Sequence, residues 1–118
     1  MPRRSKDFYR GISFQPPAPV AAAARRALAL RAQQPASNRG MTPVGLARAR
    51  QLSHRQELSP TTIDRMVSYI ARHTIDKQGS SWGAYGKGRQ AWDCWGGDPG
   101  RSWARAVARR MDAAERRG

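Results

Sequence analysis

The stretch SPTTIDRMVSYIARH, residues 59–73, decides the fold class of this 118-residue chain. Its large apolar residues recur at i, i+3, i+4 and i+7, which is the spacing of the buried face of an α-helix. They are Ile63, Met66, Val67 and Ile70. Ser59 before Pro60 is a typical helix start, because the serine oxygen accepts an unpaired backbone N–H and proline suits the first helical position. We therefore expect a core-facing helix over residues 60–73.

The same start signal occurs twice more, at Thr42-Pro43 and at Asp98-Pro99. It predicts helices over 43–52 and 99–115. A shorter helix over 89–95 is expected to end at the following Gly-Gly pair, because glycine favours the left-handed conformation found there. No stretch alternates like a strand, so the sequence predicts an all-α class: a small Trp-rich domain of about four short helices at 42–115. Its predicted core is Ile63, Met66, Val67, Ile70, Trp92, Trp95, Trp103, Val107 and Met111.

The region before this domain divides into three segments. Residues 1–18 are expected to form an extended, proline-containing arm; 19–34, an Ala/Arg-rich helix; and 35–41, a linker. The arm carries four large apolar residues within seven positions, Phe8, Tyr9, Ile12 and Phe14. Two interpretations stay open: the arm binds a partner through these side chains, or it folds back and covers its own domain. Whether the 19–34 helix packs on the domain is also open.

Positive charge dominates the composition. The chain has 22 Lys+Arg against 8 Asp+Glu, a net charge of +14, and all but three of its cations are arginine. Such a chain attracts polyanions, and arginine binds phosphate and carboxylate groups in a two-pronged geometry. Arg101, Arg105 and Arg109 recur every four residues on the last predicted helix, with Arg110 beside them. Like charges at this spacing repel, so we favour an anion-binding or partner-binding face there over a merely solvated one.

Several function classes find no support in the sequence. No apolar run is long enough to span a membrane, and the single cysteine, Cys94, excludes an internal disulfide. The two histidines lack metal-ligand spacing, and Asp93 and Asp98 are expected to have structural roles. The aromatic residues could stack on nucleic-acid bases, but scarce aliphatic residues favour a core role for most of them. Trp82 and Tyr85 are the better candidates for exposure. We predict no catalytic residue, no cofactor and no metal site.

Two motifs resemble a small domain found in tailed-bacteriophage genomes, often within head and structural genes. The first is SPTTIDRMVSYIARH (59–73), which matches the pattern R-M-x-S-Y-x-A-R-H. The second is AWDCWGGDPGRSWA (91–104), which matches A-W-x-x-W-G-G-D-x-G-x-x-W-A. The resemblance implies a phage protein and brings no established enzymatic activity. It does not extend to the first 40 residues.

These observations lead to one expected function and one alternative. We expect a non-enzymatic virion structural protein of the cement or decoration type. It would bind capsid or other virion proteins within a homo- or hetero-oligomeric assembly, in the virion and, before assembly, in the host cytoplasm. The alternative is a small basic protein that binds nucleic acid non-specifically in the infected cell.

Overall fold

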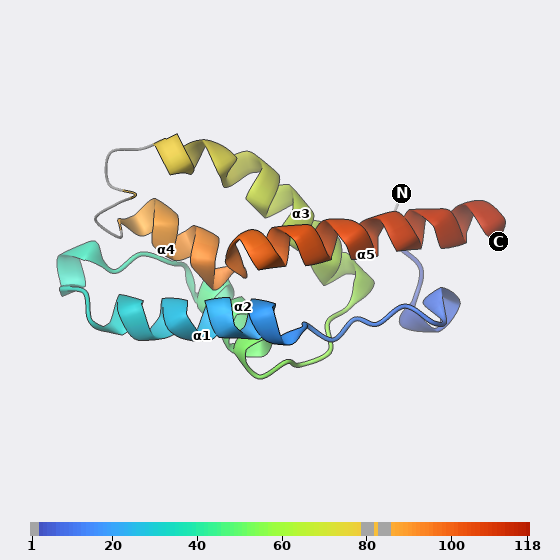
Figure 1. Cartoon of the computed structure of the whole chain (residues 1–118), viewed down its shortest axis with the longest axis horizontal. Helices are drawn as coiled ribbons and strands as arrows, with labels where there is room; N and C mark the ends of the chain where they lie inside the picture. The colour runs from blue at the N-terminus through green and yellow to red at the C-terminus, as the bar shows by residue number, and fades with distance from the viewer. Residues whose placement is uncertain (1–2, 79–81, 83–85) are drawn as a thin grey trace.

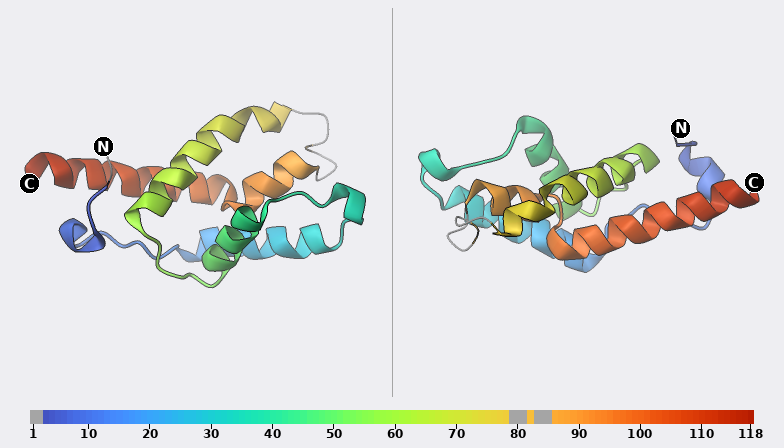
Figure 2. Two further views of the ribbon diagram at one scale, coloured as in Figure 1. Left: turned by 180° about the vertical axis from the view of Figure 1, so that it is seen from behind. Right: turned by 90° about the horizontal axis from the view of Figure 1, so that it is seen from above.

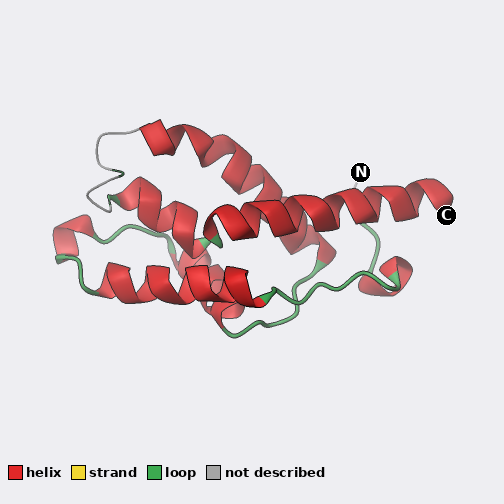
Figure 3. Ribbon diagram, in the orientation of Figure 1, coloured by secondary structure: helices red, strands yellow, loops and turns green. Residues whose placement is uncertain are grey.

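Five α-helices form the body of the molecule, with α1 running alongside α4 and α5 (Figure 1). The computed structural model describes residues 3–78, 82 and 86–118, and these contain no strand (Figure 3). The α-helices are α1 (Ala18–Ala32), α2 (Pro43–Ser53), α3 (Pro60–His73), α4 (Lys87–Cys94) and α5 (Gly97–Arg117). Three short 3-10 helices accompany them, η1 (Lys6–Tyr9), η2 (Ala36–Asn38) and η3 (Thr74–Gln78). The predicted all-α class is confirmed.

Two of the three predicted helix caps are confirmed. The hydroxyl oxygen of Thr42 accepts a hydrogen bond from the Gly45 amide at the start of α2, at 3.1 Å. The hydroxyl oxygen of Ser59 likewise accepts from the Thr62 amide at the start of α3, also at 3.1 Å. The third prediction is wrong, because α5 begins at Gly97, two residues before Pro99. The Asp98 carboxylate caps no helix and instead accepts hydrogen bonds from Lys77 and from the Trp92 indole.

A glycine turn joins α4 to α5. Gly96 has φ +104° and Gly97 has φ +62°, both in the left-handed region that residues with a side chain rarely adopt. A Cβ atom on Gly96 would lie 2.9 Å from the Cα of Gly100, which is backbone that cannot easily move. Glycine at this position therefore allows α5 to leave α4 in its observed direction.

Helix α1 belongs to the same packed body as the later helices, which answers the question left open by the sequence. It packs against α2, α4 and α5. Its buried face consists of small residues, Val20, Ala21, Ala23, Ala24 and Ala27, and small side chains let neighbouring helices approach closely. The compact body thus includes residues 18–32 together with the helices that follow residue 42.

The predicted linker at 35–41 is fixed to α4 by one buried amide. Gln90 is fully buried, and its Oε1 accepts from the Gly40 amide at 2.8 Å. Its Nε2 donates to the carbonyl oxygen of Asn38. Arg31, near the end of α1, also donates to the carbonyl oxygen of Gly40, at 2.8 Å. This segment is therefore an ordered connection between α1 and α2.

The N-terminal segment folds back onto the molecule instead of extending from it. Tyr9 is 1% exposed and Phe14 is 4% exposed, and both belong to the main hydrophobic core. The segment lies along the C-terminal half of α5, where Arg3 binds the carboxylates of Asp112 and Glu115 (Figure 2). The structure thus corrects the expectation of an extended arm, because burial of the aromatic rings against the chain's own helices outweighs the cost of ordering the segment.

Candidate anion-binding surface

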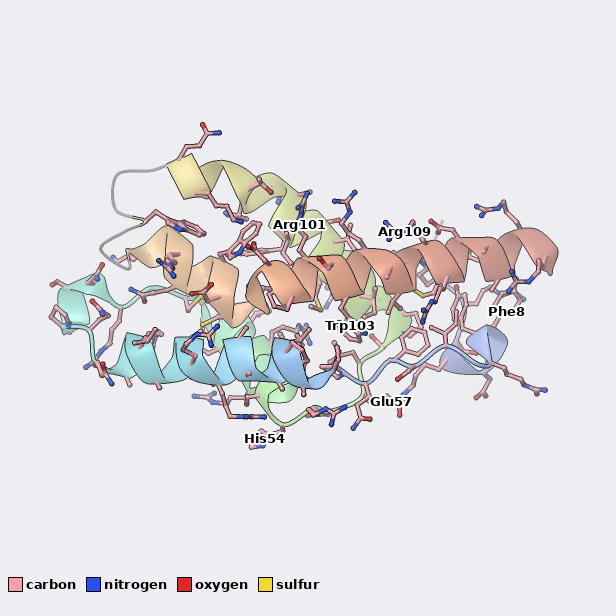
Figure 4. The ribbon with its side chains drawn as sticks, in the orientation of Figure 1. Phe8, His54, Glu57, Arg101, Trp103 and Arg109 are labelled. Carbon is pink, nitrogen blue, oxygen red and sulfur yellow. The ribbon has the colours of Figure 1, made fainter. Side chains whose placement is uncertain are left out.

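Four arginines on α5 form an exposed surface that we call the arginine face. Its members are Arg101, Arg105, Arg109 and Arg110, and each is solvent-exposed. The opposite side of α5 buries Ala104, Val107 and Met111. Four residues advance an α-helix by about 6 Å. The side chains of Arg101, Arg105 and Arg109 therefore leave one side of the helix at nearly regular intervals. Figure 4 shows Arg101 and Arg109 on one edge of α5 and Trp103 on the other.

The arginine face borders a groove between α3 and α5. Arg101 and Arg105 line a cavity of about 430 Å³ together with the apolar side chains of α3. These α3 residues are Val67, Ile70 and Ala71, followed by Thr74. A second hollow of about 250 Å³ lies on α5 itself, between Arg101, Ser102, Arg105 and Arg109. The face therefore offers cationic groups beside a shallow apolar surface.

The acidic residues that follow the arginine face on α5 are paired with another cation. Asp112 and Glu115 on α5 both accept hydrogen bonds from Nη1 of Arg3, at 2.7 and 2.5 Å. Arg3 also forms a two-pronged pair with Asp64 of α3, at 2.7 and 3.0 Å. This pair with Asp64, together with the other two carboxylates, raises the pKa of Arg3 above its ordinary value.

Over the rest of the described molecule, too, the ion pairs use most of the acidic residues but few of the cations. The ion pairs that the structure describes occupy six of the eight acidic residues but only four cations, because three carboxylates converge on Arg3. Within the described ranges, Arg105, Arg109 and Arg110 form no ion pair. The arginine face consequently keeps its charge and presents it to solvent.

The predicted partner-binding residues of the arm are differently placed. Tyr9 and Phe14 are buried, and Phe8 and Ile12 are partly buried against the same core. The ring of Phe8 lies edge-on to Tyr9, with 5.1 Å between ring centroids, and Arg4 lies 4.6 Å from the Phe8 centroid. Among the described residues of the arm, these four large apolar side chains are buried or partly buried against the chain's own core, so the folded-back interpretation describes it.

Seven of the nine predicted core residues are buried. These are Ile63, Met66, Ile70, Trp92, Trp95, Val107 and Met111, whereas Val67 and Trp103 are partly buried at the margin of the core. Trp82 is partly buried and lies edge-on to Trp92, with 6.0 Å between the ring centroids. Tyr85 lies outside the described residues. The rings that the structure describes are thus largely committed to packing.

Sequence reasoning missed Arg48, a residue of α2. Arg48 is only 8% exposed. A signal was available, because the residues buried along α2 include Gly45, Arg48, Ala49 and Leu52, at the i, i+3, i+4 and i+7 positions of one face. An arginine in such a stripe looks like an interruption of the apolar pattern, and only the packed structure shows that it is turned inward.

The polar groups near the α4–α5 turn have structural partners. Asp93 pairs with Arg89 one turn earlier, with 3.6 Å between Oδ2 and Nε. The Lys77 ammonium lies 2.6 Å from the Asp98 carboxylate, and this hydrogen bond is the main cause that lowers the pKa of Asp98. Among the described residues, no group of three metal-ligating side chains could hold an ion. In the same residues, no helix has the length and apolar composition needed to cross a membrane.

We expect Cys94 to be unreactive in the folded protein. Its side chain is fully buried, and this burial raises the pKa of the thiol to about 11, so little thiolate forms at neutral pH. Labelling with a thiol reagent at pH 7.5 should be slow in buffer and fast in denaturant. Labelling in buffer at the rate of a free thiol would show that the region around Ala27, Ala49 and Cys94 is open in solution.

Comparisons with known proteins found no match. No family model matches the chain, and neither a curated protein nor a solved structure matches it.

Proposed function

We propose that the chain is a non-enzymatic structural protein of a tailed-phage virion that binds an acidic surface of the shell through the arginine face. The observation that carries the proposal is that the face is exposed while Asp112 and Glu115, which follow it on α5, bind Arg3 instead. The resemblance of the two sequence motifs to phage head-region proteins supplies the phage context. A cationic surface favours an acidic partner and speeds its association.

In this role α5, rather than the N-terminal arm, contacts the shell. The apolar side chains of the arm are used within the molecule, whereas the groove beside Arg101 and Arg105 provides an apolar floor of α3 side chains. A partner segment that carries carboxylates around one or two apolar side chains fits both features. The protein would act as part of a repeated assembly in the virion.

A charge-reversal variant tests the proposal. Arg101→Glu, Arg105→Glu and Arg109→Glu together should abolish co-sedimentation with purified shells, because attraction is replaced by repulsion. The matched control is Arg26→Glu, Arg50→Glu and Arg117→Glu, three exposed arginines elsewhere, which also lowers the net charge from +14 to +8. Equal loss in both variants would mean that total charge matters and the arginine face does not.

The protein's copy number in nuclease-treated particles provides the second test. Quantitative mass spectrometry should find a fixed ratio to the major shell protein. Absence from the particle contradicts the virion role.

Nucleic-acid binding is the second candidate, and the net charge of +14 with three regularly spaced arginines favours it. Each phosphate contact contributes about −0.9 to the slope of log affinity against log salt on duplex DNA. If the arginine face binds DNA, the triple variant should make that slope less steep by the contribution of about three phosphate contacts. The matched control should leave the slope nearly unchanged. Weak binding at low salt alone supports neither candidate, because any chain of this charge shows it.

A further inference from the structure

Arg48 is a buried cation for which the described part of the chain provides no carboxylate. Its Nη1 donates to Oε1 of Gln51, while its Nε has no hydrogen-bond partner. Burial lowers the pKa of Arg48, and the positive charge of Arg65 lowers it further. Arginine nevertheless stays protonated at neutral pH. Two cations therefore lie near each other, one of them in the protein interior, without the anion that normally accompanies a buried charge.

A pocket of about 330 Å³ lies beside this pair, on the outer side of α3, and we call it the α3 pocket. Arg65 and Arg72 line it, together with the hydroxyl-bearing residues Thr61, Ser68 and Tyr69. Trp95 forms another part of its wall, and the guanidinium carbon of Arg48 lies 5.6 Å from the centroid of the Trp95 ring. The pocket thus combines cations with hydroxyl donors, the groups that bind phosphate oxygens.

One carboxylate, that of Asp64, also lines the α3 pocket, and it is paired with Arg3. Asp64 binds Arg3 through both of its oxygens, at 2.7 and 3.0 Å. The folded-back N-terminal segment therefore supplies a cation that competes with the pocket's arginines for this carboxylate. Because Arg3 also binds Asp112 and Glu115, its charge offsets Asp64 only in part, and the positive charge available to a ligand in the pocket lies on Arg65 and Arg72.

Ring packing indicates which part of a ligand the pocket can recognise. His73 stacks on Tyr69 with 4.2 Å between ring centroids, and Tyr69 stacks on Trp95 with 4.5 Å. Tyr69 therefore has a ring against each face, and Trp95 has Tyr69 on one face and Arg48 over its ring. Neither ring offers a free face on which a nucleobase could stack. Recognition in this pocket would rest on the anionic group alone.

We propose that the α3 pocket binds a small phosphate-class anion, either inorganic phosphate or a phosphomonoester, through Arg65 and Arg72 of its lining, with the buried charge of Arg48 beside the Trp95 wall adding to the attraction. The site is separate from the arginine face of α5, and the inference does not depend on the proposed virion role. Binding to the folded state alone raises its stability in proportion to the logarithm of ligand concentration. Phosphate should therefore raise the thermal stability of the protein.

The test is a thermal unfolding titration with phosphate, compared with chloride at equal ionic strength. The Tm of the wild-type protein should rise with phosphate, and amide NMR shifts should concentrate at residues 61–72 and at the Trp95 indole. Arg48→Met should weaken phosphate binding at least tenfold, whereas Arg50→Met, an exposed neighbour on the same helix, should not. If Arg48→Met does not fold, Arg65→Gln serves as the second variant, with the same expected loss. The triple variant of the arginine face should keep the response.

Three results would overturn the inference. The first is a wild-type Tm that responds to phosphate no more than to chloride. The second is an equal response in the Arg48 and Arg50 variants. The third concerns the ligand: adenosine monophosphate and ribose 5-phosphate should bind within tenfold of each other, since the rings are covered. A larger preference for the nucleotide would show that the pocket recognises a base, which contradicts the proposed mode of binding.

Discussion

Gly96→Ala should lower the free energy of unfolding by about 3 kcal/mol, a large part of the total for a domain of this size. Two costs combine at this residue. An L side chain is strained at φ +104°, and the new Cβ would lie 2.9 Å from the Cα of Gly100. Relief of that contact would move α5 relative to α4 and disturb the core around Trp92 and Trp95. Urea unfolding followed by circular dichroism measures the loss.

Gly11→Ala is the matched control for this prediction. Gly11 has φ +85°, so it carries a similar backbone strain, but nothing lies within 4 Å of the position that its Cβ would take. We expect a loss of about 1 kcal/mol, from strain alone. If the two variants lose the same amount, the close approach of Gly96 to Gly100 does not contribute to stability.

Tyr9→Ala should lower the free energy of unfolding by about 3 kcal/mol and release the N-terminal segment. Tyr9 is 1% exposed, and its ring packs against Phe14 with 6.2 Å between centroids. Its hydroxyl accepts a hydrogen bond from the Arg4 amide at 3.0 Å. The truncation removes this packing and leaves a cavity in the main core. Urea unfolding gives the stability, and limited trypsin digestion reports release through cleavage at Arg4, Lys6 and Arg10.

The neighbouring substitution Phe8→Ala provides the comparison, because Phe8 is aromatic but only partly buried. It should cost less than half as much and leave the trypsin pattern nearly unchanged. The interpretation of the arm as a free partner-binding segment makes the opposite prediction. Under that interpretation, neither substitution changes the stability of the isolated chain, and trypsin cleaves the wild-type arm as quickly as the variants.

The local features of this chain were open to prediction because neighbouring residues cause them. The apolar spacing in 59–73 predicted α3 with its observed bounds, and the Thr42 and Ser59 caps follow from one side chain and one nearby amide. The exposure of the arginine face follows from the apolar residues on the opposite side of α5. Asp98 shows the limit of this reasoning. Its sequence context resembles a cap, but Lys77 and the Trp92 indole compete for its carboxylate from other parts of the fold.

The sequence by itself determined the all-helical class, the helix starts at Thr42 and Ser59, most of the apolar core and the excess of arginine. Only the tertiary structure decided where the charges act. Arg3 reaches Asp64, Asp112 and Glu115 across at least 61 residues of sequence, so these three carboxylates pair with the N-terminal segment rather than with the arginines of α3 and α5. Periodicity shows which side of a helix is apolar, but the pairing of distant charges depends on how the helices pack, because electrostatic interactions depend on distance and burial in the folded chain.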